Sequence, residues 1–201
     1  MIARWILAAL TALFLAATVI AGGGSEDARA GDTQTAIFAG GCFWCVEDAF
    51  DQVDGVTETI SGYAGGTKPN PTYGDHTGYL EAVKVTYDPA KVSYAKLVDH
   101  FWQNIDPFDA EGQFCDKGPA YHSAIFVAND EEKTLAETTK DEIATRFKQK
   151  VATEIKPTTS FTAAEDYHQD YHNQNPVSYK YYKWGCGRAQ RLAEIWDKPH
   201  S

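Results

Sequence analysis

The feature that most constrains the fold is a repeated change in the spacing of apolar residues. Residues 35–39 form a short apolar run, whereas apolar side chains recur three and four positions apart through residues 42–53. The first pattern predicts a buried strand and the second predicts a helix. The same succession returns where apolar and polar residues alternate over residues 80–87 and a helical pattern fills residues 93–105. We expect one domain in which a sheet is packed against helices.

The remaining expected elements complete this domain. Further strands are expected at residues 56–63, 121–128 and 151–155, a charged helix at 129–150, and irregular loops at 64–78 and 107–120. Beyond them the sequence predicts short elements and an aromatic tail that ends at Gly185-Cys186-Gly187. The expected fold is an α/β chain of the α+β two-layer sandwich type, with a mixed sheet, a ferredoxin-like core and a long irregular C-terminal tail.

Residues 1–30 differ in character from the rest of the chain. Arg4 is followed by an uncharged, largely apolar run from Trp5 to Ala21, and then by three glycines. A short basic start, an apolar centre and small residues at cleavage points indicate a secretory signal. An uncleaved membrane anchor is the alternative, because the run is near the lower limit for crossing a bilayer. We expect residues 31–201 to form a domain outside the cytoplasm, periplasmic or secreted.

The charge of the chain excludes two classes of partner. The formal net charge is −10 and the isoelectric point is near 5.0. Nucleic acids and anionic membrane surfaces attract clustered Lys and Arg side chains, and the sequence contains no such cluster. We therefore expect no nucleic-acid partner.

The four cysteines raise the question of chemistry. In an exported protein they would by default form two structural disulfides. Cys42, however, follows Gly40-Gly41 where the predicted strand gives way to a helix. Free peptide N–H groups at a helix N-terminus stabilise a thiolate, so this position favours a nucleophile.

Cys42 and Cys45 also form a C-x-x-C pair, which has two other interpretations. A thioredoxin-type redox pair is one, although bulky Phe and Trp residues lie between the cysteines. A zinc site is the other, but it needs a second close pair of ligands, and Cys115 and Cys186 stand alone. His168 and His172 have the spacing of half a metal site, and a hydrogen-bonded structural role is favoured for them. We expect no metal.

Glu81 is the candidate acid. It lies on a predicted strand between Leu80 and Ala82, and a carboxyl group in an apolar setting has a raised pKa and can donate a proton near neutral pH. The alternative is an edge-strand glutamate that faces water. Asp116 with Gly118 is equally compatible with simple turn chemistry.

Five sequence blocks, taken in order, resemble those of the A-type peptide methionine sulfoxide reductases. The resemblance covers essentially the whole chain after the export segment. The blocks are GGCFWCVE at residues 40–47, GYAGG with NPTY at 62–73, TGYLEAV at 77–83, DKGPAYHSAIF at 116–126, and AEDYHQ with NP at 164–176.

The resemblance implies a role for each matching residue. Cys42 would attack the sulfur of methionine sulfoxide while Glu81 protonates its oxygen. Both groups must act in one pocket, because that oxygen leaves poorly until it is protonated. The implied substrate-binding residues are Phe43 and Trp44 around the S-methyl group, and Tyr73, Tyr121 and Asp116, the last acting through water, around the oxygen.

The same resemblance implies how the enzyme is regenerated. The sulfenic acid left on Cys42 would condense with Cys186 to form a disulfide. A thioredoxin-like dithiol would then reduce that disulfide, so no bound cofactor is implied. The implied activity is reduction of methionine S-sulfoxide, free or in oxidised proteins, by a monomeric repair enzyme.

The sequence departs from the family pattern at several positions. Many members carry Gly at the position of Cys45, for which we favour a spectator thiol, although it stays a candidate to resolve the sulfenic acid. Cys115 precedes Asp116 and is a further redox candidate. Tyr79-Leu80 replaces His-Ala before Glu81, which affects its expected pKa, and His122 replaces an arginine.

Two other functions compete with the reductase. The first is a thiol–disulfide oxidoreductase that uses Cys42 and Cys45 and needs neither Glu81 nor Cys186. The second is a non-enzymatic exported domain in which all four cysteines form structural disulfides.

Overall fold

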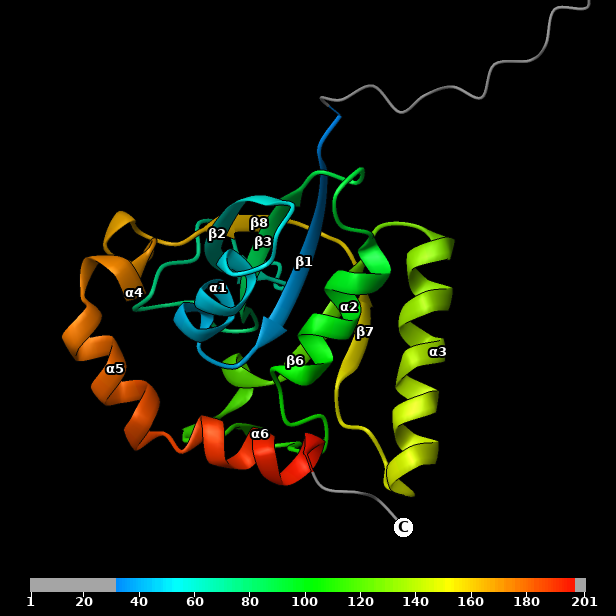
Figure 1. Cartoon of the computed structure of the whole chain (residues 1–201). Helices are drawn as coiled ribbons and strands as arrows, with labels where there is room; N and C mark the ends of the chain where they lie inside the picture. The colour runs from blue at the N-terminus through cyan, green and yellow to red at the C-terminus, as the bar shows by residue number, and fades with distance from the viewer. Residues whose placement is uncertain (1–31, 198–201) are drawn as a thin grey trace, which may run out of the picture.

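The computed structural model describes residues 32–197 (Figure 1). The predicted export segment, residues 1–30, lies outside the described residues. Within residues 32–197, every helix is too short or too polar to cross a membrane.

A six-stranded sheet forms the centre of the domain. Its order is β7-β6-β1-β3-β2-β8, where the strands are β1 (Gln34–Gly40), β2 (Val56–Ala64), β3 (Leu80–Tyr87), β6 (Ser123–Val127), β7 (Glu154–Pro157) and β8 (Phe161–Ala163). Neighbouring strands are antiparallel except β6 and β7, which are parallel. The expected mixed sheet with helices packed against it is therefore confirmed.

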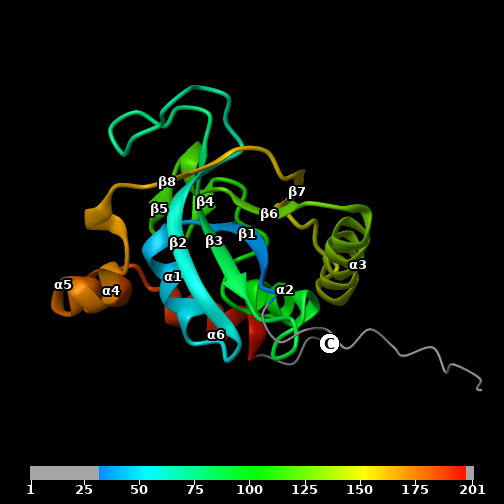
Figure 2. The same ribbon diagram turned by 90° about the horizontal axis from the view of Figure 1, so that it is seen from above.

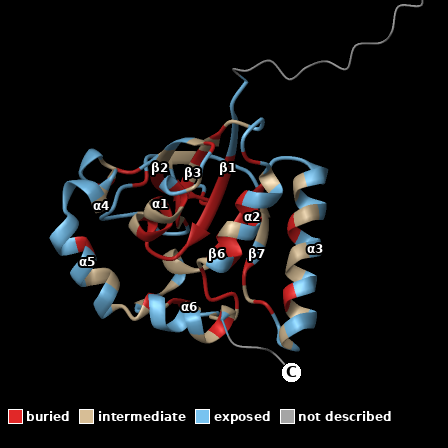
Figure 3. Cartoon of the chain, in the orientation of Figure 1, coloured by how far each residue is buried: buried red, intermediate tan, exposed pale blue. Residues whose placement is uncertain are grey.

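Two crossover helices cover one face of this sheet. α1 (Phe43–Asp51) links β1 to β2, and α2 (Tyr94–Gln103) leads from β3 toward β6 (Figures 1 and 2). Their apolar faces pack on alternate strand residues in one large core that includes Phe38, Phe50, Val83, Val85, Leu97 and Phe101. Buried residues accordingly concentrate in the strands and in the inner faces of these helices (Figure 3). The longer helix α3 (Asp130–Phe147) is mostly exposed.

One predicted loop and the starts of two predicted strands differ in the structure. The expected loop 107–120 contains a small hairpin, β4 (Gly112–Gln113) and β5 (Asp116–Lys117). A 3-10 helix, η1 (Pro119–Tyr121), follows the hairpin, so the next strand begins at Ser123. The strand expected at residue 151 begins instead at Glu154.

The expected irregular C-terminal tail is wrong. It consists of η2 (Asp166–His168), α4 (Tyr171–Gln174), α5 (Pro176–Gly185) and α6 (Arg188–Trp196). Side chains fasten these helices to the domain: Tyr179 donates to Asp48 at 2.7 Å, and Arg188 donates to the carbonyl of Asn104 at 2.8 Å. Gly187 has a φ of 69°, so the Gly-Cys-Gly segment turns the chain from α5 into α6.

Candidate active site

Two glycines place Cys42 at the start of α1. Gly41 has a φ of 84°, and a Cβ there would lie 2.5 Å from Cβ of Gln113. Only glycine satisfies both conditions easily. The chain can therefore turn sharply out of β1, which makes Cys42 the N-cap residue of α1.

A small cavity of about 80 Å³ opens at this helix start. Seven of the eight residues proposed from the sequence line it, and Tyr182 is added to them. The lining residues are Cys42, Phe43, Trp44, Tyr73, Glu81, Asp116, Tyr121 and Tyr182. Segments far apart in the sequence are therefore brought together around one thiol and one carboxyl group.

Glu81 is buried in the middle of the sheet. Its strand, β3, lies between β1 and β2, and Glu81 is only 1% exposed. The water-facing edge glutamate is thereby excluded. Burial raises the pKa of Glu81 to about 8, against the lowering effect of a 3.1 Å hydrogen bond from the N–H of Phe43. A protonated Glu81 can accept this bond with Oε2 and donate with Oε1.

The thiol of Cys42 does not behave as the sequence suggested. Burial, then a hydrogen bond with Cys45 and the charges of Cys45 and Glu81, raise the pKa of Cys42, whereas a hydrogen bond with Tyr182 lowers it. The expected lowering at the helix N-terminus is wrong for this state. One reason is that the free N–H of Phe43, the first residue of α1, binds Glu81 instead of the thiol.

Cys45 is buried beside Cys42, and both are free thiols. The hydrogen bond that it shares with Cys42, and then the positive charge of Arg188, lower the pKa of Cys45 despite burial. Two thiols joined by one hydrogen bond titrate as a pair, and the second proton leaves with more difficulty than the first. In this pair the proton is retained on Cys42.

Three phenols surround the cavity as hydroxyl donors. Burial raises the pKa of Tyr73, Tyr121 and Tyr182, so each keeps its proton at neutral pH. Tyr182 donates to Oδ2 of Asp116 at 2.6 Å. Burial also raises the pKa of Asp116, against the lowering effect of that bond.

The aromatic wall of the cavity is fixed from behind. Trp44 stacks on Tyr171 with ring centroids 3.8 Å apart, and its Nε1 donates to Nδ1 of His168 at 3.2 Å. His172 lies elsewhere, with Nε2 3.4 Å from Oδ2 of Asp51. Nδ2 of Asn173 also lies within hydrogen-bond distance of Nε2 of His172, at 3.0 Å. The hydrogen-bonded role predicted for these histidines is therefore confirmed.

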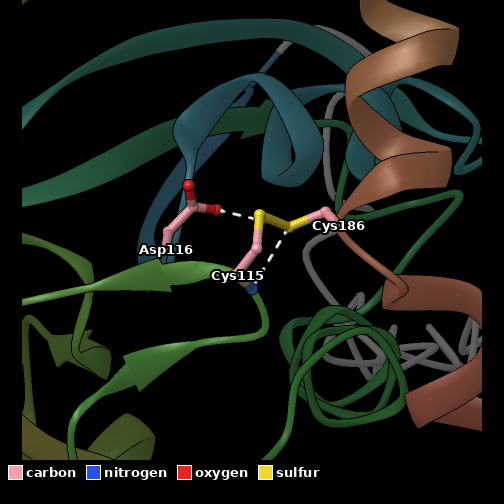
Figure 4. A group of neighbouring side chains, drawn as sticks. All are labelled: Cys115, Asp116 and Cys186. Carbon is pink, nitrogen blue, oxygen red and sulfur yellow. Dashed lines mark hydrogen bonds between the residues drawn. A yellow bond between two sulfur atoms is a disulfide. The ribbon is translucent and has the colours of Figure 1, made fainter.

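The other two cysteines form a disulfide between the β4–β5 hairpin and the end of α5 (Figure 4). Cys115 is exposed and Cys186 is half-buried, and their Cα atoms are 4.9 Å apart. Oδ2 of Asp116 lies 3.8 Å from Sγ of Cys186. Cys186 is thus joined to Cys115 and not to Cys42, and it is the one proposed site residue outside the cavity lining. With Cys42 and Cys45 free, four structurally paired cysteines are excluded.

Tyr182 is the residue that sequence reasoning missed. It joins the two cysteine pairs, because it is hydrogen-bonded to Cys42 on one side and to Asp116, next to Cys115, on the other. The available signal was the spacing of Tyr179, Tyr182 and Cys186 at three and four residues, which predicts one face of a helix.

Comparisons with known proteins agree with this arrangement. A family model described as peptide methionine sulfoxide reductase matches residues 34–200. Peptide methionine sulfoxide reductase MsrA 2 of Rhizobium meliloti is 48% identical over 171 residues, which cover 84% of this chain and 86% of the relative. Methionine sulfoxide reductase A of Corynebacterium diphtheriae has a TM-score of 0.66 at 33% identity, covering 72% of this chain and 76% of that one. Mxr1 from Saccharomyces cerevisiae in reduced form gives 0.66 at 30% identity, with 72% and 86% covered. The chain therefore belongs to the peptide methionine sulfoxide reductase family and reduces methionine S-sulfoxide to methionine.

Proposed function

We propose that Cys42 is the nucleophile of this reduction and Glu81 its acid. The observation that carries the proposal is a buried carboxyl group with a pKa of about 8 in the same cavity as the only thiol that lines it. Near pH 7 this carboxyl group is mostly protonated and can donate to the sulfoxide oxygen. Attack by Cys42 on the sulfur transfers the protonated oxygen to the sulfur of Cys42, and the thiol proton returns to the Glu81 carboxylate. The products are methionine and a Cys42 sulfenic acid.

The remaining cavity residues bind the substrate. The hydroxyl groups of Tyr73 and Tyr121, with Asp116 acting through water, orient the sulfoxide oxygen for protonation. Phe43 and Trp44 surround the S-methyl group. The stacking and hydrogen bonding of Trp44 support this role, because a wall held on two sides keeps its shape when the small substrate enters.

The second step passes the oxidation to the surface. Cys186 attacks the Cys42 sulfenic acid, which releases water and forms a Cys42–Cys186 disulfide. Cys115 then attacks Sγ of Cys186, and Cys42 leaves as a thiol. The product is a chain with a Cys115–Cys186 disulfide and two free cysteines, the combination that the described residues contain. This combination supports Cys186 as the resolving cysteine and Cys115 as the second one.

An external dithiol completes the cycle. A thioredoxin-like protein reduces Cys115–Cys186 and restores the four thiols. Mxr1 from Saccharomyces cerevisiae, which shares the fold, has been solved in complex with Trx2. The uncharged run at residues 5–21 supports export of the protein, to the periplasm or by secretion. In this proposal the enzyme is a monomer that repairs oxidised proteins, with residues 31–201 as its catalytic domain.

The proposal extends to the core of the fold. Four of the strands support a ferredoxin-like unit. They lie in the order β6-β1-β3-β2, every neighbouring pair is antiparallel, and α1 and α2 are the crossover helices. β7 and β8 then extend its two edges. The unit places the C-terminal end of β1 and the N-terminal start of β3 beside the start of α1, where the cavity opens.

Single-turnover chemistry tests this function. Fully reduced protein is mixed without oxygen with the separated S and R epimers of a blocked methionine sulfoxide, and methionine and thiols are counted. With one equivalent of sulfoxide per chain, we expect the S epimer to give about one methionine and the loss of two thiols, and the R epimer to give neither. Failure to form methionine while a disulfide substrate is reduced would instead assign the chain to the oxidoreductases that use Cys42 and Cys45.

A further inference from the structure

The outer face of α5 is apolar and open to solvent. Val177, Tyr181 and Trp184 are 82%, 76% and 80% exposed, and they are three of the five large hydrophobic side chains exposed among residues 32–197. Their spacing of four and three residues places them on one face of the helix. We call these three residues the α5 stripe. A gathered exposed apolar surface of this kind marks an interaction site more often than isolated residues do.

The α5 stripe contributes little to holding the fold. The opposite face of α5 anchors the helix, through the hydrogen bond from Tyr179 to Asp48 and the ion pair between Lys183 and Asp48 at 2.5 Å. Tyr182 on that inner side lines the cavity. The stripe is therefore available for a second molecule without disturbing these contacts.

The same helix ends at the disulfide. α5 finishes at Gly185, and Cys186 follows as its C-cap, two residues after Trp184. A Cβ added at Gly185 or Gly187 would meet nothing within 4 Å, so open space flanks the half-cystine on both sides. Cys115 is itself exposed. An approaching protein can therefore cover the stripe and reach the disulfide together.

We propose that the α5 stripe is the docking surface for the dithiol protein that reduces Cys115–Cys186. This inference rests on the proposed function. A small thiol needs no apolar platform, whereas a protein that brings its nucleophilic cysteine to a disulfide must desolvate a surface around that cysteine. The occupant is a protein with a C-x-x-C dithiol and an apolar rim around its exposed cysteine.

The exposure of the two cysteines determines which sulfur of the disulfide the partner attacks. A thiolate of the partner attacks Sγ of Cys115, the more exposed of the two residues, and the bond to Cys186 breaks. Cys186 leaves as a thiolate next to the N–H of Cys115, which lies 3.2 Å from its sulfur, and takes up a proton. The second thiol of the partner attacks the mixed disulfide, releases Cys115 and leaves the partner oxidised. Two electrons pass from the dithiol to the disulfide.

Steady-state turnover with two reductants tests the surface. The substrate is a blocked methionine S-sulfoxide, and the reductant is either a bacterial thioredoxin with its reductase or dithiothreitol. We expect the double variant Tyr181→Ser, Trp184→Ser to raise the KM for thioredoxin about tenfold or more, because aromatic anchors dominate such interfaces. The rate with dithiothreitol and the single-turnover yield should stay unchanged. Tyr167→Ala, another exposed aromatic residue, is the matched control and should leave the KM for thioredoxin unchanged.

Three results would overturn the inference. The first is an unchanged KM for thioredoxin in the double variant. The second is an equal loss with dithiothreitol, which would mean that the stripe acts on the site or the fold. The third is an effect confined to the KM for an oxidised protein substrate, which would make the stripe a substrate surface. Failure of the proposed function is seen separately, because the single-turnover yield would then already be absent in the unmodified chain.

Trapping identifies the sulfur that is attacked. A thioredoxin whose second active-site cysteine is replaced by serine should accumulate as a mixed disulfide with Cys115, located by peptide mapping. Gly185→Leu should slow this trapping, because the added side chain occupies the open space beside Cys186. A Cβ at this position contacts no other atom of the folded chain within 4 Å, so the fold should be unaffected. Linkage to any other cysteine, or trapping at an unchanged rate in both Gly185→Leu and the double stripe variant, would contradict the step.

Discussion

The two cysteine pairs of this protein occupy opposite environments. Cys42 and Cys45 are 6% and 3% exposed and are thiols, whereas Cys115 is exposed, Cys186 is half-buried, and the two form a disulfide. Burial keeps Glu81 protonated next to the first pair, which the reduction of a sulfoxide requires. Exposure opens the second pair to a protein reductant. Under the proposed function, this difference separates substrate chemistry from regeneration within one small domain, and Tyr182 contacts both regions.

The largest expected effect is on methionine formation, and it should differ between variants that lack one thiol of the buried pair or one of the exposed pair. Cys42→Ser should lower single-turnover methionine formation by at least about a thousandfold, because a nucleophile has no substitute in the cavity. Cys115→Ser should keep the full burst of methionine and stop at a Cys42–Cys186 disulfide. Rapid-quench assays with peptide mapping measure both. A normal burst in Cys42→Ser, or none in Cys115→Ser, would break the division between the two regions.

The next effect concerns the proton held in the buried region. Glu81→Gln should lower the single-turnover rate by about a hundredfold or more, since the amide cannot protonate the oxygen. The unmodified chain should also lose rate as the pH rises through about 8, where Glu81 ionises, and the variant should lack that fall. Rates between pH 6 and 9.5 provide the check.

Glu47 supplies the matched control for this carboxyl group. Glu47 is buried on α1, its pKa is raised to about 7 mainly by burial, and it accepts the N–H of Asp170 at 3.0 Å outside the cavity. Glu47→Gln should keep full activity. A carboxyl group whose folded pKa is raised weakens the fold as pH rises from its unfolded pKa toward the folded one. Each Gln variant lacks this loss, so its free energy of unfolding, compared with that of the unmodified chain, should be more favourable at pH 8 than at pH 5. Equal activity losses in both variants would contradict a special role for Glu81.

Tyr182→Phe probes the link between the two regions. The loss of its hydroxyl removes the hydrogen bonds to Asp116 and Cys42, and we expect a rate about tenfold lower and a Cys42 pKa that rises further. Single-turnover rates over a pH range measure both quantities. Tyr181→Phe removes an exposed neighbouring hydroxyl and should change neither. If the two variants behave alike, Tyr182 does not connect the regions.

The smallest expected effect is a change in the pKa of Cys42 when its buried neighbour Cys45 is replaced. Cys45→Ser removes the charge and the thiol hydrogen bond that raise the pKa of Cys42, so Cys42 should ionise at lower pH. The pH dependence of alkylation of Cys42 by iodoacetamide, with Cys115–Cys186 left oxidised, gives the direction of the shift. The variant should still form methionine and lose two thiols per turnover. Loss of the second thiol only when Cys45 is present would make Cys45 the resolving cysteine.

The sequence predicted the buried region better than the exposed one, for a physical reason. The alternation of Val83, Val85 and Tyr87 places Glu81 on the same face of β3 as these core residues, and two glycines before Cys42 mark a strand-to-helix junction. Both signals are local. The disulfide joins residues 71 positions apart, and no local pattern pairs Cys115 with Cys186.

Two errors in the sequence analysis have identifiable causes. The C-terminal helices were missed because aromatic and Asn residues suggested an irregular tail, although the contacts of Tyr179 and Arg188 with distant segments hold that region in place. The pKa of Cys42 was expected to fall because a helix N-terminus was visible in the sequence. The burial of the thiol and the capture of the Phe43 N–H by Glu81 were not visible there.

The transfer of oxidation from the buried pair to the exposed pair is tested most directly by timed disulfide mapping. Fully reduced protein is mixed with the S epimer, and samples are quenched with acid at increasing times. The remaining thiols are then alkylated, and each cysteine linkage is quantified. The account predicts that a Cys42–Cys186 disulfide rises first and is replaced by Cys115–Cys186 while Cys45 stays alkylated. A Cys42–Cys45 disulfide as the first linkage, or a Cys115–Cys186 disulfide that never forms, would contradict it.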